Sequence, residues 1–505
     1  MLANHLVILP ILIPLFAALL QLLPWGDNPQ RYRRIIGITA SSLTLITAIW
    51  LVGSVQDEVL VYALGSWQAP FGIVLVADKL AALMVALTAV LALPVLIFAC
   101  HGEDNLGSHF QALYQFQILG IMGAFLTGDL FNLFVFFEIL LISSYALLMH
   151  GGGKLKLRAT LHYVVLNLTG SALFLISLGV LYGITGTLNM ADMAGKVAVL
   201  EGDDAALARA GGMLLFVVFG LKAALLPLYF WLPQAYANTT GTVAALFAIM
   251  TKVGIYAIIR VFTMIFGADA GESSNLAQDW LWWLGLFTIF IGALGVLGSR
   301  DLRLVVAYLV LVSVGTMLTT LSLGHTDAIG ALLFYLVHST LVTAALFLLA
   351  DLIAEQRGKT ASRIVKGRKM AQHNLLGGLF FLAAITVIGM PPLSGFVSKL
   401  FILEAARTGA QVVFLWPLIL GATFLMMIAL SRAGSRMFWH TFEGKPNETT
   451  HPKWQHASVV MLLLSAVALT VFAQPISKYT DAIAIQLTTP FEYISSVLPT
   501  GGPDE

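Results

Sequence analysis

The sequence predicts an all-α membrane protein that crosses the bilayer many times. Of its 505 residues, 59% are hydrophobic and only 10% are charged, whereas soluble domains average roughly 25% charged residues. Apolar runs of about 18 residues or more, the length that spans a bilayer as a helix, recur along the whole chain. These two observations exclude a soluble multidomain protein.

Windows of twenty apolar residues predict about 14 membrane-spanning helices. The predicted segments are 3–24, 35–55, 74–99, 108–127, 130–149, 159–184, 211–230, 241–264, 280–298, 302–323, 327–353, 375–406, 411–433 and 456–475. The third is the least regular, because Asp78 and Lys79 lie near its start. The first lacks a basic start and a cleavage site of small residues, so we expect it to be retained rather than removed as a signal peptide.

The charges of the connecting loops predict the orientation of the chain. Lys and Arg gather after odd-numbered segments, around 31–34, 154–158, 300–303 and 357–369, and Asp and Glu gather after even-numbered ones. Because basic loops remain in the cytoplasm, we expect both termini on the outer side. The acidic pair Glu103–Asp104 is an exception on the basic side.

Prolines interrupt two of the predicted helices. The seventh contains Pro227, and the twelfth contains Pro391 and Pro392. A proline frees backbone hydrogen-bonding groups that lipid cannot satisfy, so such a break needs buried or hydrated surroundings. The breaks are five helices apart, an offset that inverts topology, and paired breaks in an inverted repeat indicate the ion site of a transporter. The alternative is that the prolines only kink tightly packed helices.

Five ionisable residues lie well inside predicted helices: Glu138, Lys222, Lys252, His338 and Lys399. A charged side chain at this depth costs about 2.5–3.5 kcal/mol on insertion scales and usually marks an ion pathway. We predict that Glu138 and Lys222 form a pair that exchanges protons, and that the other three continue the path. The alternatives are a structural ion pair, lysines that reach an interface, and a histidine held by ordinary packing.

Four residues are secondary candidates. Asp129 either caps the fifth helix or gives outer access to it, and His162 and its neighbour Asn167 lie in the sixth segment. The hydroxyl of Thr343 either extends a wet path or bonds its own helix. Arg260 lies near the end of the eighth segment, and we interpret it as a residue that reaches the interface.

The sequence predicts no cofactor, no metal site and no nucleic-acid surface. A single cysteine, Cys100, excludes an internal disulfide, and no metal-ligand spacing is present. Gly151–Lys154 lacks the spacing, the preceding strand and the final hydroxyl residue of a phosphate-binding loop. A formal net charge of +1 argues against nucleic-acid binding. The energy for transport must then come from an ion gradient or from partner subunits.

In combination, the motifs resemble those of one family. Three stretches carry the resemblance: Phe136–Glu138, Lys222–Ala237 with its prolines, and Pro391–Lys399. They look like the antiporter-like subunits of respiratory complex I, of membrane-bound hydrogenases and of Mrp (Mnh/Pha)-type multisubunit Na⁺(K⁺)/H⁺ antiporters, over essentially the whole chain. The opening stretch Asn4–Pro14, the run Thr127–Asn132 and the compact length most resemble the D subunits of the Mrp type.

The resemblance implies a fourteen-helix core with two inverted five-helix repeats. It divides the chain into helices 1–3, the two repeats, and a last helix with a tail, at residues 1–107, 108–265, 266–438 and 439–505. It also implies that the five ionisable residues form a polar axis, and that the chain is part of a hetero-oligomer in a bacterial inner membrane. Relatives often carry a lysine where Thr343 stands, which weakens the expected relay from His338 to Lys399.

The leading hypothesis is a proton-translocating subunit of a monovalent cation/proton antiporter, in which proton movement along the axis is coupled to efflux of Na⁺ or K⁺. A second hypothesis is a proton-pumping subunit of complex I or of a hydrogenase, which iron–sulfur partner subunits would favour. A third is a structural scaffold, for which charge-neutral substitutions would abolish assembly or do nothing, without selectively blocking transport.

Overall fold

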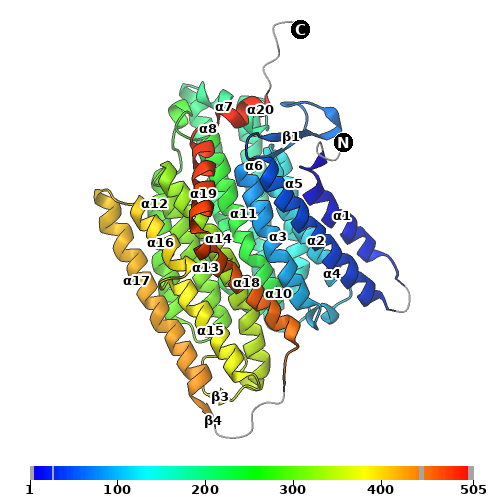
Figure 1. Cartoon of the computed structure of the whole chain (residues 1–505). Coiled ribbons are helices and arrows are strands. Elements are labelled where there is room, and N and C mark those ends of the chain that lie inside the picture. The colour runs from blue at the N-terminus through cyan, green and yellow to red at the C-terminus, as the bar shows by residue number, and fades with distance from the viewer. Residues whose placement is uncertain (1–4, 26–27, 443–448, 499–505) are drawn as a thin grey trace.

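Helices make up most of the computed structural model, which describes residues 5–25, 28–442 and 449–498. They stand side by side in an elongated bundle with two ends (Figure 1). The α-helices are α1 Leu9–Leu22, α2 Pro29–Ser54, α3 Lys79–Ala99, α4 Phe110–Leu126, α5 Leu130–Met149, α6 Lys154–Thr185, α7 Met190–Ala198, α8 Gly202–Ala223, α9 Trp231–Asn238, α10 Gly241–Leu246, α11 Met250–Met264, α12 Gln278–Gly298, α13 Leu302–Leu321, α14 Thr326–Gln356, α15 His373–Ile388, α16 Ser394–Ala405, α17 Gly409–Gly434, α18 Lys453–Val471, α19 Ala473–Thr488 and α20 Phe491–Val497. Short 3₁₀ turns include η3 Glu103–Leu106, η4 Leu228–Phe230 and η5 Phe247–Ile249.

Two small sheets in the described part of the chain depart from the all-α prediction. Strand β1 (Leu60–Ala63) pairs antiparallel with β2 (Val74–Ala77), and β3 (Gly367–Arg368) pairs in parallel with β4 (Thr441–Phe442). They lie at opposite ends of the bundle (Figure 1). Strands this short leave the helical architecture unchanged.

Eleven helical segments among the described residues are long and apolar enough to cross a membrane. This confirms a multi-pass membrane protein. Three shorter apolar helices, α1, α4 and α15, have 14, 17 and 16 residues, and they coincide with the first, fourth and twelfth predicted segments. Residues 3 and 4 of the first segment, and 443–448 and 499–505 of the predicted C-terminal part, lie outside the described residues.

Two predicted boundaries are wrong, and the first concerns the third segment. The prediction begins this segment at residue 74, but residues 74–77 form strand β2 and the helix begins only at Lys79. Asp78 separates the two elements, because its carboxylate accepts a hydrogen bond from the backbone N–H of Ala81 at 2.8 Å and caps the helix. A hydropathy window cannot distinguish a buried apolar strand from the helix that follows it.

The second wrong boundary is at the C-terminus, where the last predicted segment, 456–475, runs past the end of α18 at Val471 into a further helix, α19. Helix α19 packs against α14 and buries Thr480, Ile483, Ala484 and Leu487. This spacing places the four side chains on one face of the helix. Polar residues such as Lys478 and Asp481 on the exposed face lower the mean hydropathy, which explains why the hydropathy windows missed the helix.

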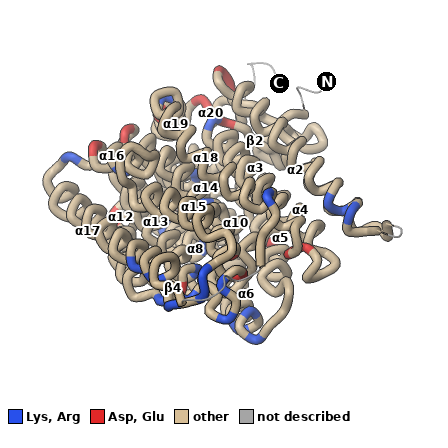
Figure 2. Tube along the Cα trace, turned by 60° about the horizontal axis from the view of Figure 1, so that its bottom comes forward, with Lys and Arg blue, Asp and Glu red and all other residues tan. Residues whose placement is uncertain are grey.

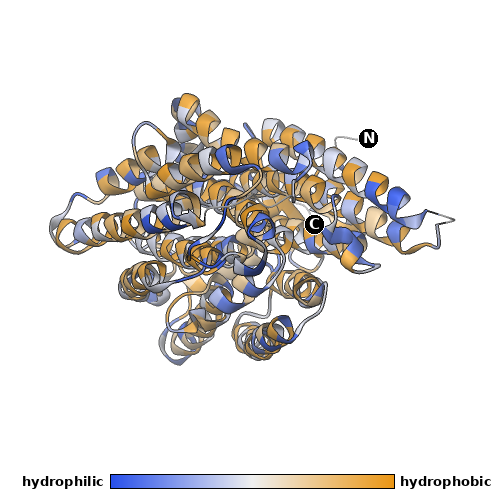
Figure 3. Cartoon of the chain, turned by 90° about the horizontal axis from the view of Figure 1, so that it is seen from below, coloured by the Kyte–Doolittle hydropathy of each residue, from blue (hydrophilic) through white to orange (hydrophobic). Residues whose placement is uncertain are grey.

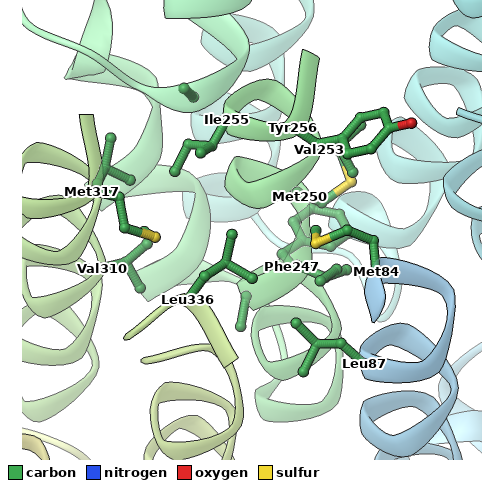
Figure 4. Packing of buried hydrophobic residues seen from close by; sticks show 14 of the residues in the cluster. Met84, Leu87, Phe247, Met250, Val253, Ile255, Tyr256, Val310, Met317 and Leu336 are labelled. Atoms are coloured by element: carbon green, nitrogen blue, oxygen red, sulfur yellow. The ribbon is translucent and has the colours of Figure 1, made fainter. Parts of the chain in front are cut away.

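The centre of the bundle is formed by α10, α11 and α14. The apolar windows of Gly241–Met264 and Thr326–Gln356 are fully buried, whereas only 28% of the window in Gly409–Trp439 is buried. Figure 4 shows the side chains of Phe247 and Met250 among the hydrophobic residues of this core. Seen from below, hydrophobic residues predominate along the helices (Figure 3). A polar group on α11 or α14 must therefore find its partner within the protein or in internal water.

The two ends of the bundle differ in charge. Lys and Arg gather at the end that carries β4 and the start of α6, and acidic residues gather near α16 and α20 (Figure 2). The exception at Glu103–Asp104 has a structural explanation, because both residues are buried. Asp104 accepts hydrogen bonds from Arg34 at 2.7 Å and from Gln111 at 3.1 Å. These two acids therefore belong to the interior and say nothing about the sidedness of the loop.

Candidate proton-transfer site

The first interruption lies between α8 and α9. Helix α8 ends at Ala223, and Pro227 follows in the irregular stretch before η4. The indole N–H of Trp231 donates a hydrogen bond to the carbonyl of Leu221 at 2.9 Å, so a side chain satisfies one carbonyl at the end of the helix. Lys222 lies in the last turn of α8, where the helix dipole favours a positive charge.

Lys222 and Glu138 both bond to α6. The Lys222 Nζ donates to Asn167 Oδ1 at 3.1 Å, and the Ser171 hydroxyl donates to the Glu138 carboxylate. Asn167 and Ser171 are four residues apart and so share one face of α6. Within the described residues, Glu138 and Lys222 form no direct ion pair. The structure instead joins the predicted pair through two neutral side chains.

Glu138 lies nearer the edge of the subunit than the sequence predicts. Lys222 is 8% exposed, but Glu138 is only half-buried. Phe131, Val135 and Ile142 of α5 are exposed in the same subunit, and their spacing places them on the side of α5 that carries Glu138. Position within an apolar segment indicates depth in the membrane, but it does not show which side of the helix faces the core.

A cavity of about 10 Å³ adjoins Lys222 and Asn167, a volume close to that needed for one water molecule. Met250 and Val253 of α11 also line it, and both are labelled in Figure 4. Gly254 allows α11 to approach α8 closely, since a Cβ there would lie 2.8 Å from the carbonyl carbon of Lys222. The first break therefore adjoins the helix that carries Lys252.

Lys252 is fully buried, and its Nζ has no hydrogen-bond partner among the described residues. The hydroxyl of the preceding Thr251 is also buried and unpartnered there. An isolated ammonium is very costly in an apolar interior. Lys252 therefore either remains a neutral amine or is solvated by internal water.

The second interruption separates α15 from α16. Helix α15 ends at Ile388, α16 begins at Ser394, and Pro391–Pro392 lie between them. The Lys399 Nζ donates to the carbonyl of Ile388 at 2.7 Å and to the hydroxyl of Thr423 at 2.9 Å. The lysine of α16 thus reaches back across the break to the C-terminal end of α15, where the helix dipole favours a cation.

His338 meets the same break from α14. It is 1% exposed, and its Nδ1 lies 2.9 Å from the hydroxyl of Ser394. A Cβ on Gly395 would lie 3.1 Å from the His338 Cε1, so the imidazole packs directly against the start of α16. The structure therefore brings His338 and Lys399, which are distant in sequence, to one interruption.

Two secondary candidates have local structural partners. Asp129 accepts a hydrogen bond from the backbone N–H of Asn132 at 2.8 Å and caps α5. The hydroxyl of Thr343 donates to the carbonyl of Ser339 at 2.6 Å. Of the two interpretations open for each residue, the structure shows the helix cap and the bond within the helix.

His162 is not part of either cluster. It is exposed on α6, whereas Asn167 is buried. The two are five residues apart, which places them on well-separated sides of a helix with 3.6 residues per turn. Of the two, only Asn167 belongs to the site, and the sequence analysis did not identify Ser171, which lies one turn later on the same face.

The interpretation of Arg260 as an interface residue is wrong. It is buried, and its guanidinium donates two hydrogen bonds of 2.7 Å to the carboxylate of Asp78. Its Cζ also lies 4.9 Å from the ring centroid of Tyr493 on α20. The carboxylate is 182 residues away in the sequence, so no local pattern could have identified this pair.

Known proteins share both the sequence and the fold. Residues 127–426 match the family described as NADH:quinone oxidoreductase/Mrp antiporter, transmembrane. The chain is 41% identical to the D subunit of a probable K⁺/H⁺ antiporter of Rhizobium meliloti and 38% identical to the D subunit of a Na⁺/H⁺ antiporter of Bacillus subtilis. These alignments cover 98% of this chain and 98% and 99% of the two relatives.

Among solved structures, the Mrp complex from a Dietzia species contains a similar chain. The TM-score is 0.86 at 27% identity, and the match covers 99% of this chain and 100% of that chain. The two relatives above are aligned over nearly their whole lengths, so the similarity is not confined to one helix pair. The chain belongs to the NADH:quinone oxidoreductase/Mrp antiporter family, and within it the relatives described above are D subunits.

Proposed function

We propose that this chain is a proton-translocating subunit of a multisubunit cation/proton antiporter. The observation that carries the proposal is the pair of helix breaks, each with a lysine ammonium at the C-terminal end of a helix, buried for Lys222 and half-buried for Lys399. Buried ionisable groups beside interrupted helices are typical of ion pathways, because the break supplies polar backbone in an otherwise apolar interior.

In this proposal the proton path has two halves. In the first, Glu138 and Lys222 exchange protons through Asn167, Ser171 and water in the small cavity, and Lys252 continues the path on α11. In the second, His338 and Lys399 act at the break between α15 and α16. Side-chain rotation and single water molecules connect groups that are not in direct contact.

The two breaks also support the proposed division of the chain. The repeats are residues 108–265 and 266–438, with 1–107 before them and 439–505 after them. Fourteen spans result when the three shorter apolar helices cross the membrane together with the eleven longer segments. With the basic end of the bundle on the cytoplasmic side, both termini lie on the outer side of a bacterial inner membrane.

Partner subunits complete the proposed assembly. A half-buried carboxylate such as Glu138 is unfavourable against lipid, so we expect a neighbouring subunit to cover this edge of α5. The names of the relatives point to K⁺ or Na⁺ as the exchanged cation. A cofactor has no part in this proposal.

The proposal is tested with Glu138→Gln and Lys222→Ala in the complete complex. We expect both variants to assemble and to lose cation-dependent proton exchange in inverted membrane vesicles. Glu404→Gln is the control, because Glu404 is exposed and pairs only with the neighbouring Arg407 among the described residues. Normal exchange by the assembled variants would overturn the proposal, and failure of assembly in both would favour a scaffold role.

A further inference from the structure

Glu103 is a buried carboxylate that the proposed proton path does not use. It lies in η3 at the basic end of the bundle and is 8% exposed. Its Oε2 accepts a hydrogen bond from the backbone N–H of Thr242 at 3.3 Å. Its Oε1 accepts no hydrogen bond of normal geometry from the described residues. One carboxylate oxygen is therefore available in a buried place.

The N-terminal end of α10 forms one wall around Glu103. Thr242 is the second residue of α10, and Thr240 caps the helix. Free N–H groups at the start of a helix favour a nearby carboxylate. The adjoining N–H of Gly241 is already used, because it donates to Asp351 of α14 at 3.1 Å. Two carboxylates from different parts of the chain thus meet at the entry to the buried helix pair α10–α11.

Charged groups from several elements face this carboxylate. Arg303 of α13, Lys156 of α6 and Glu355 of α14 lie close enough to interact with it electrostatically. The Nε2 of His150 also lies 2.7 Å from the backbone carbonyl of Glu103. Arg303 is engaged by the carboxylate of Asp351, and among the described residues Glu103 itself forms no ion pair.

Burial raises the pKa of the Glu103 carboxyl, while the hydroxyls of Thr242 and Thr240 and the charge of Arg303 act in the opposite direction. A carboxyl in this balance can hold a proton and release it. Lys156 is only half-buried, so the surroundings of Glu103 reach the surface of the basic end, where Figure 2 shows Lys and Arg to be concentrated. Glu103 thus lies between the surface of the basic end and the buried helices α10 and α11.

Buried polar atoms without partners among the described residues lie around Lys252, on the inner side of this place. Between Thr242 and Lys252 the chain of α10, η5 and α11 rises about 15 Å at 1.5 Å per residue. The Thr251 hydroxyl, the Lys252 Nζ and the Gln117 Oε1 are buried and unpartnered among the described residues. The amide of Gln117 contacts Met250, its Nε2 lying 2.9 Å from the sulfur. Buried polar groups of this kind are normally satisfied by ordered water.

We propose that Glu103 is the proton-loading carboxylate at the basic end of the subunit, passing protons from that side to Lys252. The ionised carboxylate accepts a proton from hydronium and leaves water. The carboxylic acid then gives the proton, through internal water, to the neutral amine of Lys252, which becomes an ammonium while the carboxylate is restored. This inference rests on the proposed function and assigns that function an entrance.

The experiment uses the complete complex in inverted vesicles and compares Glu103→Gln, Glu103→Asp and Glu355→Gln. We expect Glu103→Gln to assemble and to lower the initial rate of proton exchange by about tenfold or more, since a positioned proton donor typically contributes at least that much. Glu103→Asp should keep most of the rate but shift the pH of half-maximal exchange. Glu355→Gln, whose carboxylate is 53% exposed, should keep the maximal rate of the wild type, and only the pH of half-maximal exchange should shift because Glu355 interacts with Glu103.

The outcomes distinguish a wrong entrance at Glu103 from a wrong proton path through Lys222. If assembled Glu103→Gln exchanges protons normally while Lys222→Ala does not, Glu103 is not the entrance, but the proposed proton path through Lys222 is kept. If Glu103→Gln, Glu103→Asp and Glu355→Gln all lose activity with an unchanged pH profile, Glu103 only holds the structure together, and the proposal also fails. If Glu103→Gln does not assemble, the pH profile of Glu103→Asp decides. If Lys222→Ala is active, the proposed function fails first, and the entrance fails with it.

Discussion

The two helix breaks hold their lysines in opposite ways. At the first, Lys222 belongs to the helix that ends, and the indole of Trp231 satisfies the carbonyl of Leu221. At the second, Lys399 belongs to the helix that begins, and its own ammonium satisfies the carbonyl of Ile388. Both ammonium groups lie near the C-terminal end of a helix, but only Lys399 is bound to the backbone there.

This difference indicates different tasks for the two lysines. Among the described residues Lys222 makes one hydrogen bond, to the side chain of Asn167, whose amide nitrogen donates to the carbonyl of Tyr163 at 2.9 Å. Lys399 makes two, one of them to a backbone carbonyl that cannot move away. Because the Trp231 indole takes over the structural task at the first break, Lys222 is free to change partners. We infer that Lys222 is the mobile proton carrier and that Lys399 also holds its break together.

The largest expected effect is on transport. Lys222→Arg keeps a positive charge but cannot release a proton, because the guanidinium stays protonated. We expect the complex to assemble and cation/proton exchange in vesicles to fall by about 100-fold. Wild-type exchange by this variant would show that Lys222 serves only as a fixed charge. It would contradict the inference that Lys222 is the mobile proton carrier.

The second-largest effect is expected on thermal stability, which should fall more when the lysine of the second break is replaced than when that of the first is replaced. Lys399→Met leaves the carbonyl of Ile388 without its donor, at a cost of about 1–3 kcal/mol for an unsatisfied buried group. Lys222→Met removes one hydrogen bond, to the side-chain oxygen of Asn167, and leaves no backbone carbonyl without a donor. Thermal unfolding of the two purified complexes should therefore show the lower midpoint temperature for Lys399→Met. Equal midpoints would contradict the structural role of Lys399.

A smaller effect on stability and exchange is expected when the indole of Trp231 is replaced. Trp231→Phe removes the hydrogen bond to Leu221 at a cost of about 1 kcal/mol, and it should reduce exchange because the end of α8 and Lys222 lose their support. Trp416→Phe is the matched control, since the indole of Trp416 in α17 donates to the carbonyl of Ala406 at 2.8 Å. The control should lose similar stability in thermal unfolding but keep its exchange rate. A parallel loss of exchange in both variants would mean a general packing effect.

The smallest effect is expected at His162. His162→Ala should change neither exchange nor stability measurably, because the imidazole lies on the exposed side of α6. Asn167→Ala, from the buried side of the same helix, should reduce exchange because Lys222 loses its acceptor. If the two variants behaved alike in the vesicle assay, α6 would not act through its buried face.

Much of the membrane fold could be predicted because hydropathy is a local property. The apolar windows overlap the eleven described helical segments that are long and apolar enough to cross a membrane, and the prolines follow the ends of α8 and α15. The same method failed at strand β2 and at α19, where length and polarity of the elements did not match a membrane helix. The candidate site was predicted less completely, since the sequence alone did not separate Asn167 from the exposed His162 and gave no reason to select Ser171.

The sequence by itself determined the positions of the breaks and the place of each charged residue within its apolar segment. Only the tertiary structure decided their partners. It placed Glu138 near the edge, joined Arg260 to Asp78 across 182 residues, and brought Glu103 to the start of α10. The physical reason is that depth follows from the length of an apolar segment, whereas the partner of a buried charge depends on which faces of distant helices pack together.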